Sequence, residues 1–198
     1  DMPQVVIGRP FRSDNVSYVD VDNVRGAYYA VAHLVRLGYH RIATITGPLE
    51  STVGLDRREG YMQALAERGI DIHQDLIVEG DFTELSGYYA MESLLNQQPK
   101  AVFAASDAMA IGAIRAIQDN GLDVPKDIAV IGFDDNHLST LADVELSTIR
   151  QPVIEIGRKA VELLLDLIEN GTQPPRHMIL DSKLIIRATC GSMHSIRS

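Results

Sequence analysis

The sequence has 198 residues, of which 45% are hydrophobic and 23% charged, and its formal net charge is −9. This acidity argues against nucleic-acid binding by this stretch alone, because neutralising phosphates requires clustered Lys and Arg. No apolar run approaches the ~20 residues of a membrane span. Cys190 is the single cysteine, which excludes an intrachain disulfide and predicts a reducing compartment, the cytoplasm.

The first part of the chain alternates short apolar stretches with helical patterns. Strand-like Val5-Val6-Ile7 follows the first residue almost at once, so we expect the chain to open in mid-fold, as a piece of something longer. Apolar residues from Val24 to Val35 recur at three- and four-residue spacing and predict a helix that stops at Gly38. The expected elements are strands at 5–7, 18–23 and 41–46 and helices at 24–37 and 56–68.

The stretch from Ala101 to Gly121 shows the repeating unit most clearly. An apolar strand over 101–104 stops at Ser106-Asp107, and a helical pattern follows at once. Ser106 is a good N-cap, and Gly121 is a good helix stop. A buried strand therefore feeds a capped helix through a very short turn, which is where open parallel sheets place their ligands.

The same alternation continues to the end of the chain. Thr83 is expected to cap a helix over 83–95, and the tail after Arg187 is expected to be disordered. The other expected elements are strands at 76–78, 128–133 and 146–150, a helix at 153–169, and the last β material at 178–186. Strands alternating with helices in this way predict an α/β fold with a parallel, doubly wound sheet.

Polar side chains follow most of the predicted strands. All strands of a parallel sheet end at one edge, so these residues are expected to gather there. Carboxylates accept from hydroxyls, a guanidinium donates in a fixed plane and a ring covers an apolar face, a set that suits a polyhydroxyl small ligand. The residues are Arg9, Asp20, Asp22, Arg57, Asp81, Phe82, Ser106, Asp107, Asp134 and Asp135.

Each of these residues also has a plain structural interpretation. Asp22 and Asp107 could simply cap helices, and Asp134 could be a turn acid, although its position at the edge favours a ligand. Arg57 could be a solvated residue of a first helical turn, where its charge is unfavourable. Phe82 could belong to the core or form a stacking platform.

Signals for catalysis are weak. The sequence lacks G-x-S-x-G, G-x-x-x-x-G-K-[ST] and a strand-linked G-x-G-x-x-G. Its six histidines show no paired metal-ligand spacing, so surface or capping roles are expected. Asp134 and Asp135 could hold a metal, but neighbouring turn acids usually face water. Cys190 has no obvious base partner, and we expect neither a cofactor nor an enzyme.

A series of motifs occurs in a fixed order between Val5 and Arg187. The motifs are Asp22-Asn23-x-x-Gly26, Leu37-Gly38-Tyr39-His40-Arg41-Ile42, Gly47-Pro48, Arg57-x-x-Gly60-Tyr61, Glu79-Gly80-Asp81-Phe82, Ser86-Gly87-Tyr88, Ala101 to Asp107, Val124-Pro125-x-Asp127-Ile128, Gly132-Phe133-Asp134-Asp135 and Thr148-Ile149-Arg150-Gln151-Pro152. The ordered set resembles the LacI/GalR family of bacterial transcription regulators. It is highly specific, whereas no single motif would be.

This resemblance implies a type I periplasmic-binding-protein-like fold, in which a small effector binds between two α/β subdomains. Residues 1–198 would form the effector-binding core, without the N-terminal helix-turn-helix that binds operator DNA. The implied subdomains are a C-terminal one (about 20–148 and 180–188) and remnants of an N-terminal one (about 1–19 and 149–179). The implied effector contacts are Arg57, Phe82, Ser106 and Asp134, with Arg9 and Asp22 near the cleft and Gln151 at a crossover.

Two stretches depart from the pattern of the family. Val144-Glu145-Leu146-Ser147-Thr148 replaces a proline-led sequence, which leaves the shape of the 136–145 loop open. Val53 stands where some relatives have a polar contact, so the identity of the effector cannot be carried over.

The resulting hypothesis is the effector-sensing core of a sugar-responsive repressor. The alternative is a periplasmic sugar-binding protein of an ABC transporter, which would need a signal peptide upstream rather than a helix-turn-helix. We also expect a homodimer. Leu138 and Leu141 are apolar in a stretch without a helical or strand period, so they either contact a second copy or tuck onto their own subdomain.

Overall fold

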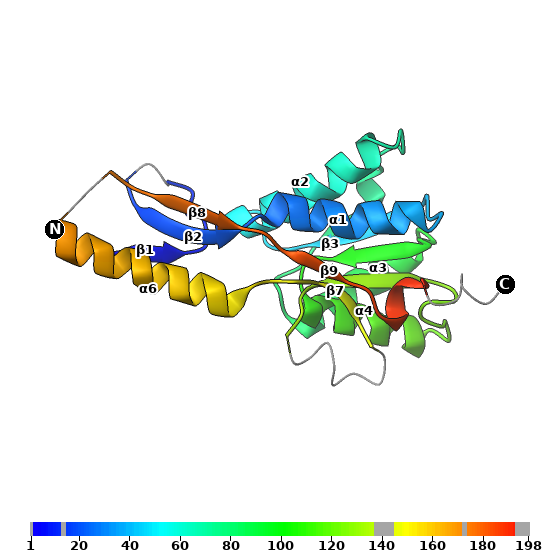
Figure 1. Cartoon of the computed structure of the whole chain (residues 1–198). Helices are drawn as coiled ribbons and strands as arrows, with labels where there is room; N and C mark the ends of the chain where they lie inside the picture. Colours follow the sequence, from blue (N-terminus) through cyan, green and yellow to red (C-terminus); the bar gives the residue numbers. More distant parts are fainter. Residues whose placement is uncertain (1, 13–14, 137–144, 172–173, 193–198) are drawn as a thin grey trace. The chain divides into compact units, whose positions relative to one another are not determined.

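The structure is a computed structural model that describes residues 2–12, 15–136, 145–171 and 174–192 (Figure 1). It divides the chain into two compact units. The smaller unit comprises Asp1–Asp22 with Gln151–Ser182, and the larger unit comprises Asn23–Arg150 with Lys183–Ser198. Among the described residues, no helix combines the length and apolar character needed to cross a membrane.

The larger unit is built on a six-stranded sheet with the strand order β4-β3-β5-β6-β7-β9. All neighbouring strands pair in parallel except β7 and β9, which are antiparallel. The strands are β3 (Ile42–Thr46), β4 (Ile77–Glu79), β5 (Ala101–Ala104), β6 (Ala129–Asp134), β7 (Ser147–Arg150) and β9 (Lys183–Ile185). The central strands β3 and β5 are buried along their whole length, as strands covered on both faces should be.

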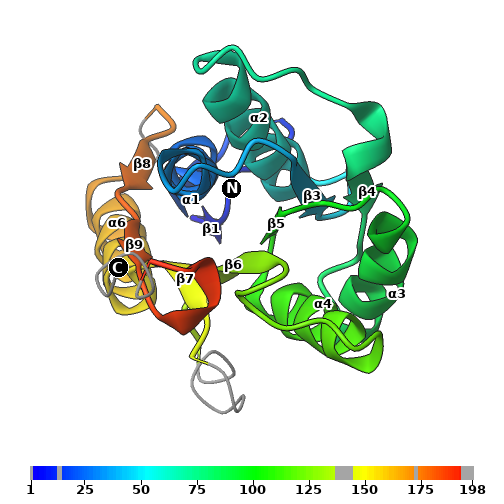
Figure 2. The same ribbon diagram turned by 90° about the vertical axis from the view of Figure 1, so that its right-hand side faces the viewer.

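Helices cover both faces of this sheet (Figure 2). They are α1 (Asn23–Arg36), α2 (Thr52–Ala66), α3 (Glu84–Leu95) and α4 (Asp107–Asp119). Side chains of α1 and α2 form one core with Phe103 and Phe133, and side chains of α3 and α4 form the other core with Ile45 and Val102. The predicted α/β, doubly wound architecture is therefore confirmed, although β9 makes the sheet mixed at one edge.

The two helices on each face approach each other at glycines. A Cβ atom built on Gly60 of α2 would lie 2.1 Å from the carbonyl oxygen of Val24 in α1. On the other face, a Cβ atom on Gly112 of α4 would lie 2.0 Å from the carbonyl oxygen of Glu84 in α3. The two helix backbones of each pair can pack this closely only because the glycines carry no side chain.

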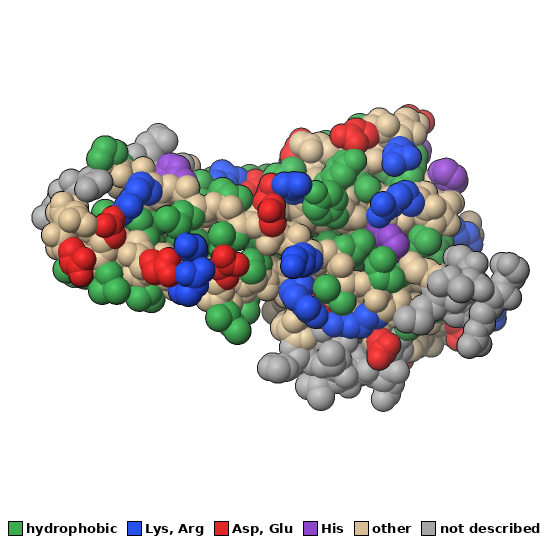
Figure 3. Space-filling view, in the orientation of Figure 1, with side chains coloured by type: hydrophobic (Ala, Val, Ile, Leu, Met, Phe, Trp, Pro, Cys, Tyr) green, Lys and Arg blue, Asp and Glu red, His purple; other side chains and the backbone are tan. Residues whose placement is uncertain are grey.

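The smaller unit holds a three-stranded parallel sheet with the strand order β1-β2-β8. Its elements are β1 (Val5–Ile7), β2 (Ser17–Val21), β8 (His177–Leu180) and α6 (Val153–Asn170). Val19 and Val21 pack against Ile156 and Leu163 of α6 in a small core of their own. Several hydrophobic side chains of α6 remain exposed beside charged ones (Figure 3), namely Val153, Ile154, Val161, Leu165 and Ile168.

Two predicted elements differ from the structure. Helix α2 begins at Thr52 rather than Asp56, because the hydroxyl of Ser51 accepts from the Gly54 amide and caps the helix a turn earlier. The predicted β material at 178–186 is two strands: β8 pairs with β2 in the smaller unit, and β9 pairs with β7 in the larger one. The change of unit after Ser182 explains why one apolar stretch serves two sheets.

The tail after Arg187 is not disordered at its start, which corrects the prediction. Ala188–Cys190 form a short 3₁₀ helix, η2, and Thr189 and Cys190 are buried. The Ser147 amide donates to the Thr189 hydroxyl at 2.8 Å and ties the segment to β7. A second 3₁₀ helix, η1 (Gln74–Leu76), precedes β4. Leu138 and Leu141 lie outside the described residues.

Candidate functional site

The candidate site lies at the carboxyl edge of the large sheet, where β4, β3, β5 and β6 end side by side. Ser106 follows β5, and its hydroxyl accepts from the Met109 amide at 3.2 Å, so the predicted N-cap is confirmed. Thr83 caps α3 in the same way, through the Ser86 amide. Because the strands are neighbours, their ends bring Phe82, Gly47, Ser106 and Asp134 to one edge in that order.

Arg57 is the central residue of this edge. It lies in the second turn of α2 and is only 4% exposed, so it is not the solvated side chain that we considered. Its Nε donates to the Asn23 Oδ1 at 2.9 Å, and its Nη1 donates to the Ala105 carbonyl oxygen at 2.6 Å. The guanidinium also lies 3.6 Å from the centre of the Phe133 ring.

The charge of Arg57 faces the carboxylate of Asp134. The distance between Arg57 Nη1 and Asp134 Oδ1 is 3.6 Å, and the Asp134 side chain is 27% exposed. A buried guanidinium requires compensation by charge and hydrogen bonds, which Asp134, Asn23 and Ala105 provide. The Arg57 guanidinium is therefore held in place by the protein, while the Asp134 carboxylate remains accessible to a ligand.

Phe82 covers the end of β3. Its ring lies directly over Gly47, since a Cβ atom there would be 2.1 Å from the Phe82 Cζ. Phe82 has φ +68°, a backbone conformation that side-chain-bearing residues rarely adopt. The ring also packs against the core below α3 and α4. Both interpretations of Phe82, core residue and platform, are thus compatible with its position.

Asp107 lies beneath the edge and does not itself cap α4. Its Oδ1 accepts from the Thr148 hydroxyl at 2.6 Å, and its Oδ2 accepts from the Asn136 amide at 3.1 Å. Burial raises the pKa of Asp107 to about 7, and the nearby charge of Asp134 adds to this, although the two hydrogen bonds act in the opposite direction. The Asp107 carboxyl group thus connects Thr148 of β7 with Asn136, which follows β6, through hydrogen bonds.

Of the other predicted residues, Asp81 lies in the larger unit, where its Oδ1 accepts from the Thr83 amide at 2.9 Å, and Arg9, Asp20, Asp22 and Gln151 belong to the smaller unit. The Arg9 amide donates to Asp20 Oδ2 at 2.8 Å, and the Asp22 amide donates to the Leu180 carbonyl oxygen. Gln151 lies just before α6, where its carbonyl oxygen accepts from the Val153 amide. Arg9, Asp22 and Gln151 therefore remain predictions, since each belongs to the other unit.

Two residues that hold Arg57 were not singled out from the sequence. Asn23 and Phe133 occur in the predicted strands and in the family motifs, but neither was given a role of its own. The alternation of side chains along β6 could have placed Phe133 on the α2 face of the sheet, but nothing local indicates the contact of Asn23 with a residue 34 positions away. Within the described part of the chain, no three His, Cys, Asp or Glu side chains form a metal site.

Cys190 does have an imidazole neighbour, which corrects the prediction. Its Sγ lies 3.6 Å from the His33 Nε2 and 3.1 Å from the Ser192 Oγ. Burial raises the pKa of the thiol, but hydrogen bonds with His33, Ser147 and Ser192 bring it down to about 6. This group lies beside η2 and the start of β7, apart from the carboxyl edge.

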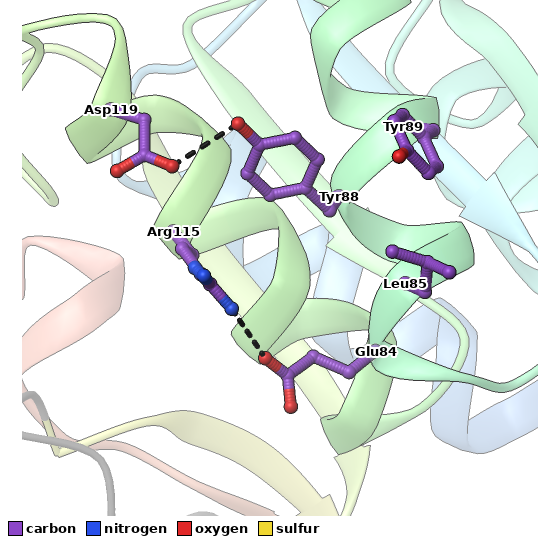
Figure 4. A pocket seen from close by; sticks show the side chains of 6 residues that line it. All are labelled: Glu84, Leu85, Tyr88, Tyr89, Arg115 and Asp119. Carbon is purple, nitrogen blue, oxygen red and sulfur yellow. Dashed lines mark hydrogen bonds and ion pairs between the residues drawn. The ribbon is translucent and has the colours of Figure 1, made fainter.

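A surface cavity of about 410 Å³ lies between α3 and α4. Its lining residues are Glu84, Leu85, Tyr88, Tyr89, Arg115 and Asp119 (Figure 4). Arg115 pairs with Glu84 at 3.7 Å, and the Tyr88 hydroxyl donates to Asp119 at 3.1 Å. Leu85 and Tyr89 are exposed beside these charges.

A parallel, doubly wound sheet with polar residues at its carboxyl edge is the arrangement in which open α/β proteins bind small molecules. Residues 31–190 match the family described as periplasmic binding protein-like domain. The chain belongs to this family, within its LacI-type transcription regulators.

Its relatives include the HTH-type transcriptional regulator CelR of Thermobifida fusca, which is 40% identical over 94% of this chain and 56% of its own length. The HTH-type transcriptional repressor CytR of Escherichia coli K12 is 40% identical over 96% of this chain and 56% of its length. A solved structure, the CelR–cellobiose complex, has a TM-score of 0.90 and 39% identity over 93% of this chain and 58% of that one. The chain thus spans little more than half the length of these relatives.

Proposed function

We propose that the chain is the effector-sensing core of a DNA-binding transcription repressor in the cytoplasm. The observation that carries this proposal is the buried Arg57, which Asn23, Ala105 and Phe133 hold in one orientation beside Asp134. Such an arrangement binds and orients a ligand. It offers no activated nucleophile, and the relatives are regulators rather than enzymes.

A sugar or sugar derivative is the effector class that suits these groups. The Asp134 carboxylate accepts from hydroxyl groups, the Arg57 guanidinium donates, and the Phe82 ring can cover the apolar face of a sugar ring. The complex of the related CelR with cellobiose supports this class. No cofactor is needed for binding of this kind.

Regulation requires that the effector bind one conformation of the protein better than another. Operator DNA would be contacted by a helix-turn-helix outside these 198 residues, in keeping with the net charge of −9. The names of the relatives, which are HTH-type regulators, favour this function over periplasmic transport.

The test is a thermal-shift screen of sugars, nucleosides and their phosphates, followed by calorimetry on the best ligand. We expect Arg57→Ala and Asp134→Ala each to weaken its binding at least about tenfold, since each loses a charge-assisted hydrogen bond. Arg68→Ala, an exposed arginine just after α2, is the control and should bind normally. Unchanged affinity in both site variants would refute the site.

The protein is further proposed to act as a homodimer, and the face around Leu85 and Tyr89 supports this. Both side chains are more than 60% exposed, and Glu84 and Arg115 place both signs of charge beside them, so the same face on a second copy would be complementary to it. Light scattering should report a dimer that Leu85→Glu weakens and Lys126→Glu, on an exposed turn, does not. A monomer at high concentration would contradict the proposal.

A further inference from the structure

The residue after Asp134 is anchored in an unusual way. Asp134 ends β6 with φ +130°, and Asp135 follows with φ +56°. Two successive side-chain-bearing residues in this region cost free energy, so the surrounding structure must hold them there. The anchor is the Asp135 side chain, which is only 5% exposed.

Two arginines grip the Asp135 carboxylate, one on each oxygen. Arg187 Nη2 lies 2.6 Å from Oδ1, and Arg150 Nε lies 2.5 Å from Oδ2. Arg150 is the last residue of β7, and Arg187 follows β9. The two ion pairs therefore connect three parts of the larger unit that are distant in sequence: the ends of β6, β7 and β9. Arg187 is itself fixed, because its Nη1 donates to the Leu146 carbonyl oxygen at 2.7 Å.

We propose that Arg187 and Arg150 are positioning residues that hold Asp135 so that Asp134 faces Arg57. This inference rests on the function proposed above. The two carboxylates are adjacent in sequence, yet Asp135 contacts Arg187 and Arg150 whereas Asp134 pairs with Arg57. Fixing one therefore fixes the backbone that carries the other.

The electrostatics of the turn agree with this role. Burial alone would raise the pKa of Asp135, but Arg187 and Arg150 hold that pKa below its usual value. The Asp135 carboxylate therefore stays ionised at neutral pH. The next residue is anchored as well, because the Asn136 amide donates to Asp107. An exposed ion pair would contribute little, but this carboxylate is shielded and doubly paired.

The test compares Arg187→Met with Lys126→Met, which removes an exposed ion pair to Asp123. The first readout is amide hydrogen exchange, which needs no ligand. We expect the Asn136 amide to exchange about tenfold faster in Arg187→Met than in Lys126→Met, with the amides of α4 unchanged. Equal rates at Asn136, or faster exchange throughout the larger unit, would overturn the proposal.

The second readout is calorimetry with cellobiose, in a double-mutant cycle with Asp134→Ala. Arg187→Met should weaken binding about tenfold in the parent chain but hardly at all when Asp134 is already absent. An equal loss in both backgrounds would show that Arg187 acts elsewhere and would overturn the proposal. Arg187→Lys, which keeps the charge, should recover part of the affinity and serves if the methionine variant does not fold.

The two readouts separate this proposal from the proposed function. If Asp134→Ala binds cellobiose normally, or the parent chain does not bind it, the site or its sugar class is wrong. The exchange rate of Asn136 then decides alone whether Arg187 holds the turn.

Discussion

At the scale of single residues, the carboxyl edge is where the chain breaks local rules. Phe82, Asp134 and Asp135 adopt positive φ values, and Arg57 and Asp107 are ionisable side chains that are almost fully buried. Such local conflicts are expected at functional sites, where geometry is maintained at the expense of stability.

Asp107 should give the chain a recognisable pH dependence. Its pKa is about 7 in the folded chain, against ~3.9 when unfolded, so between these values the folded state holds a proton that the unfolded state has released. The contribution of Asp107 to the free energy of unfolding therefore falls as pH rises from about 4 to about 7, then stays constant. Urea unfolding across this range should show a smaller decline in Asp107→Asn than in the parent chain. Parallel curves would contradict the assignment.

Gly47 should be intolerant of a side chain because of Phe82. Gly47→Ala places a methyl group where the Phe82 ring lies, so we expect a loss of about 1–3 kcal/mol in unfolding free energy as the ring is displaced. The double variant Gly47→Ala with Phe82→Ala should be about as stable as Phe82→Ala alone, since the obstruction is gone. Denaturant unfolding of the three variants measures these free energies. If Gly47→Ala costs as much stability without the Phe82 ring as with it, the loss does not come from contact with that ring.

The meeting of Phe82, Ser106 and Asp134 at one edge could be predicted from the sequence, since strand ends, caps and the family motifs all point there. Ser106 as a cap illustrates what local pattern can establish. The contacts of Arg57 with Asn23 and of Asp135 with Arg187 could not be predicted, because they join positions 34 and 52 residues apart. Periodicity describes which face a residue occupies, but it does not say which distant side chain shares that face.

At the scale of elements, the helix pairs depend on glycine at their crossings. Gly112→Ala should destabilise the larger unit by roughly 1–3 kcal/mol, because the new methyl group meets the Glu84 backbone, which cannot rotate away. Gly157→Ala in α6 is the control: nothing lies within 4 Å of its Cβ position, so the variant should gain up to about 1 kcal/mol of helix propensity. Urea unfolding measures whether each variant loses or gains free energy of unfolding. No change in Gly112→Ala would mean that the helices separate easily.

Element boundaries also show where sequence patterns reach their limit. The start of α2 was missed because apolar periodicity is weak there, whereas the Ser51 cap that fixes it is a single hydroxyl. The division of 178–186 between two sheets depends on which strand each half pairs with. Pairing is a tertiary choice, and both halves have the same β propensity.

At the scale of the whole molecule, the two units differ in the size of their sheets and hydrophobic cores. The larger unit has a six-stranded sheet with a core on each face. The smaller unit has three strands, one described long helix and a core of five buried hydrophobic residues, which are Val19, Val21, Ile156, Ala160 and Leu163. Because stability rises with the fraction of surface that a unit buries, the smaller unit of this chain should be the less stable one.

Unfolding of the 198-residue chain should therefore depart from two-state behaviour, with the smaller unit opening first. Amide hydrogen exchange followed by mass spectrometry should show α6 and β2 exchanging together, and well before α4 and β5. Ile156→Ala, which removes a buried side chain of the smaller core, should accelerate exchange in α6 and leave α4 unaffected. Ile117→Ala, its counterpart in α4, should accelerate α4 instead. Simultaneous exchange of both units in every variant would show that they unfold as one cooperative body.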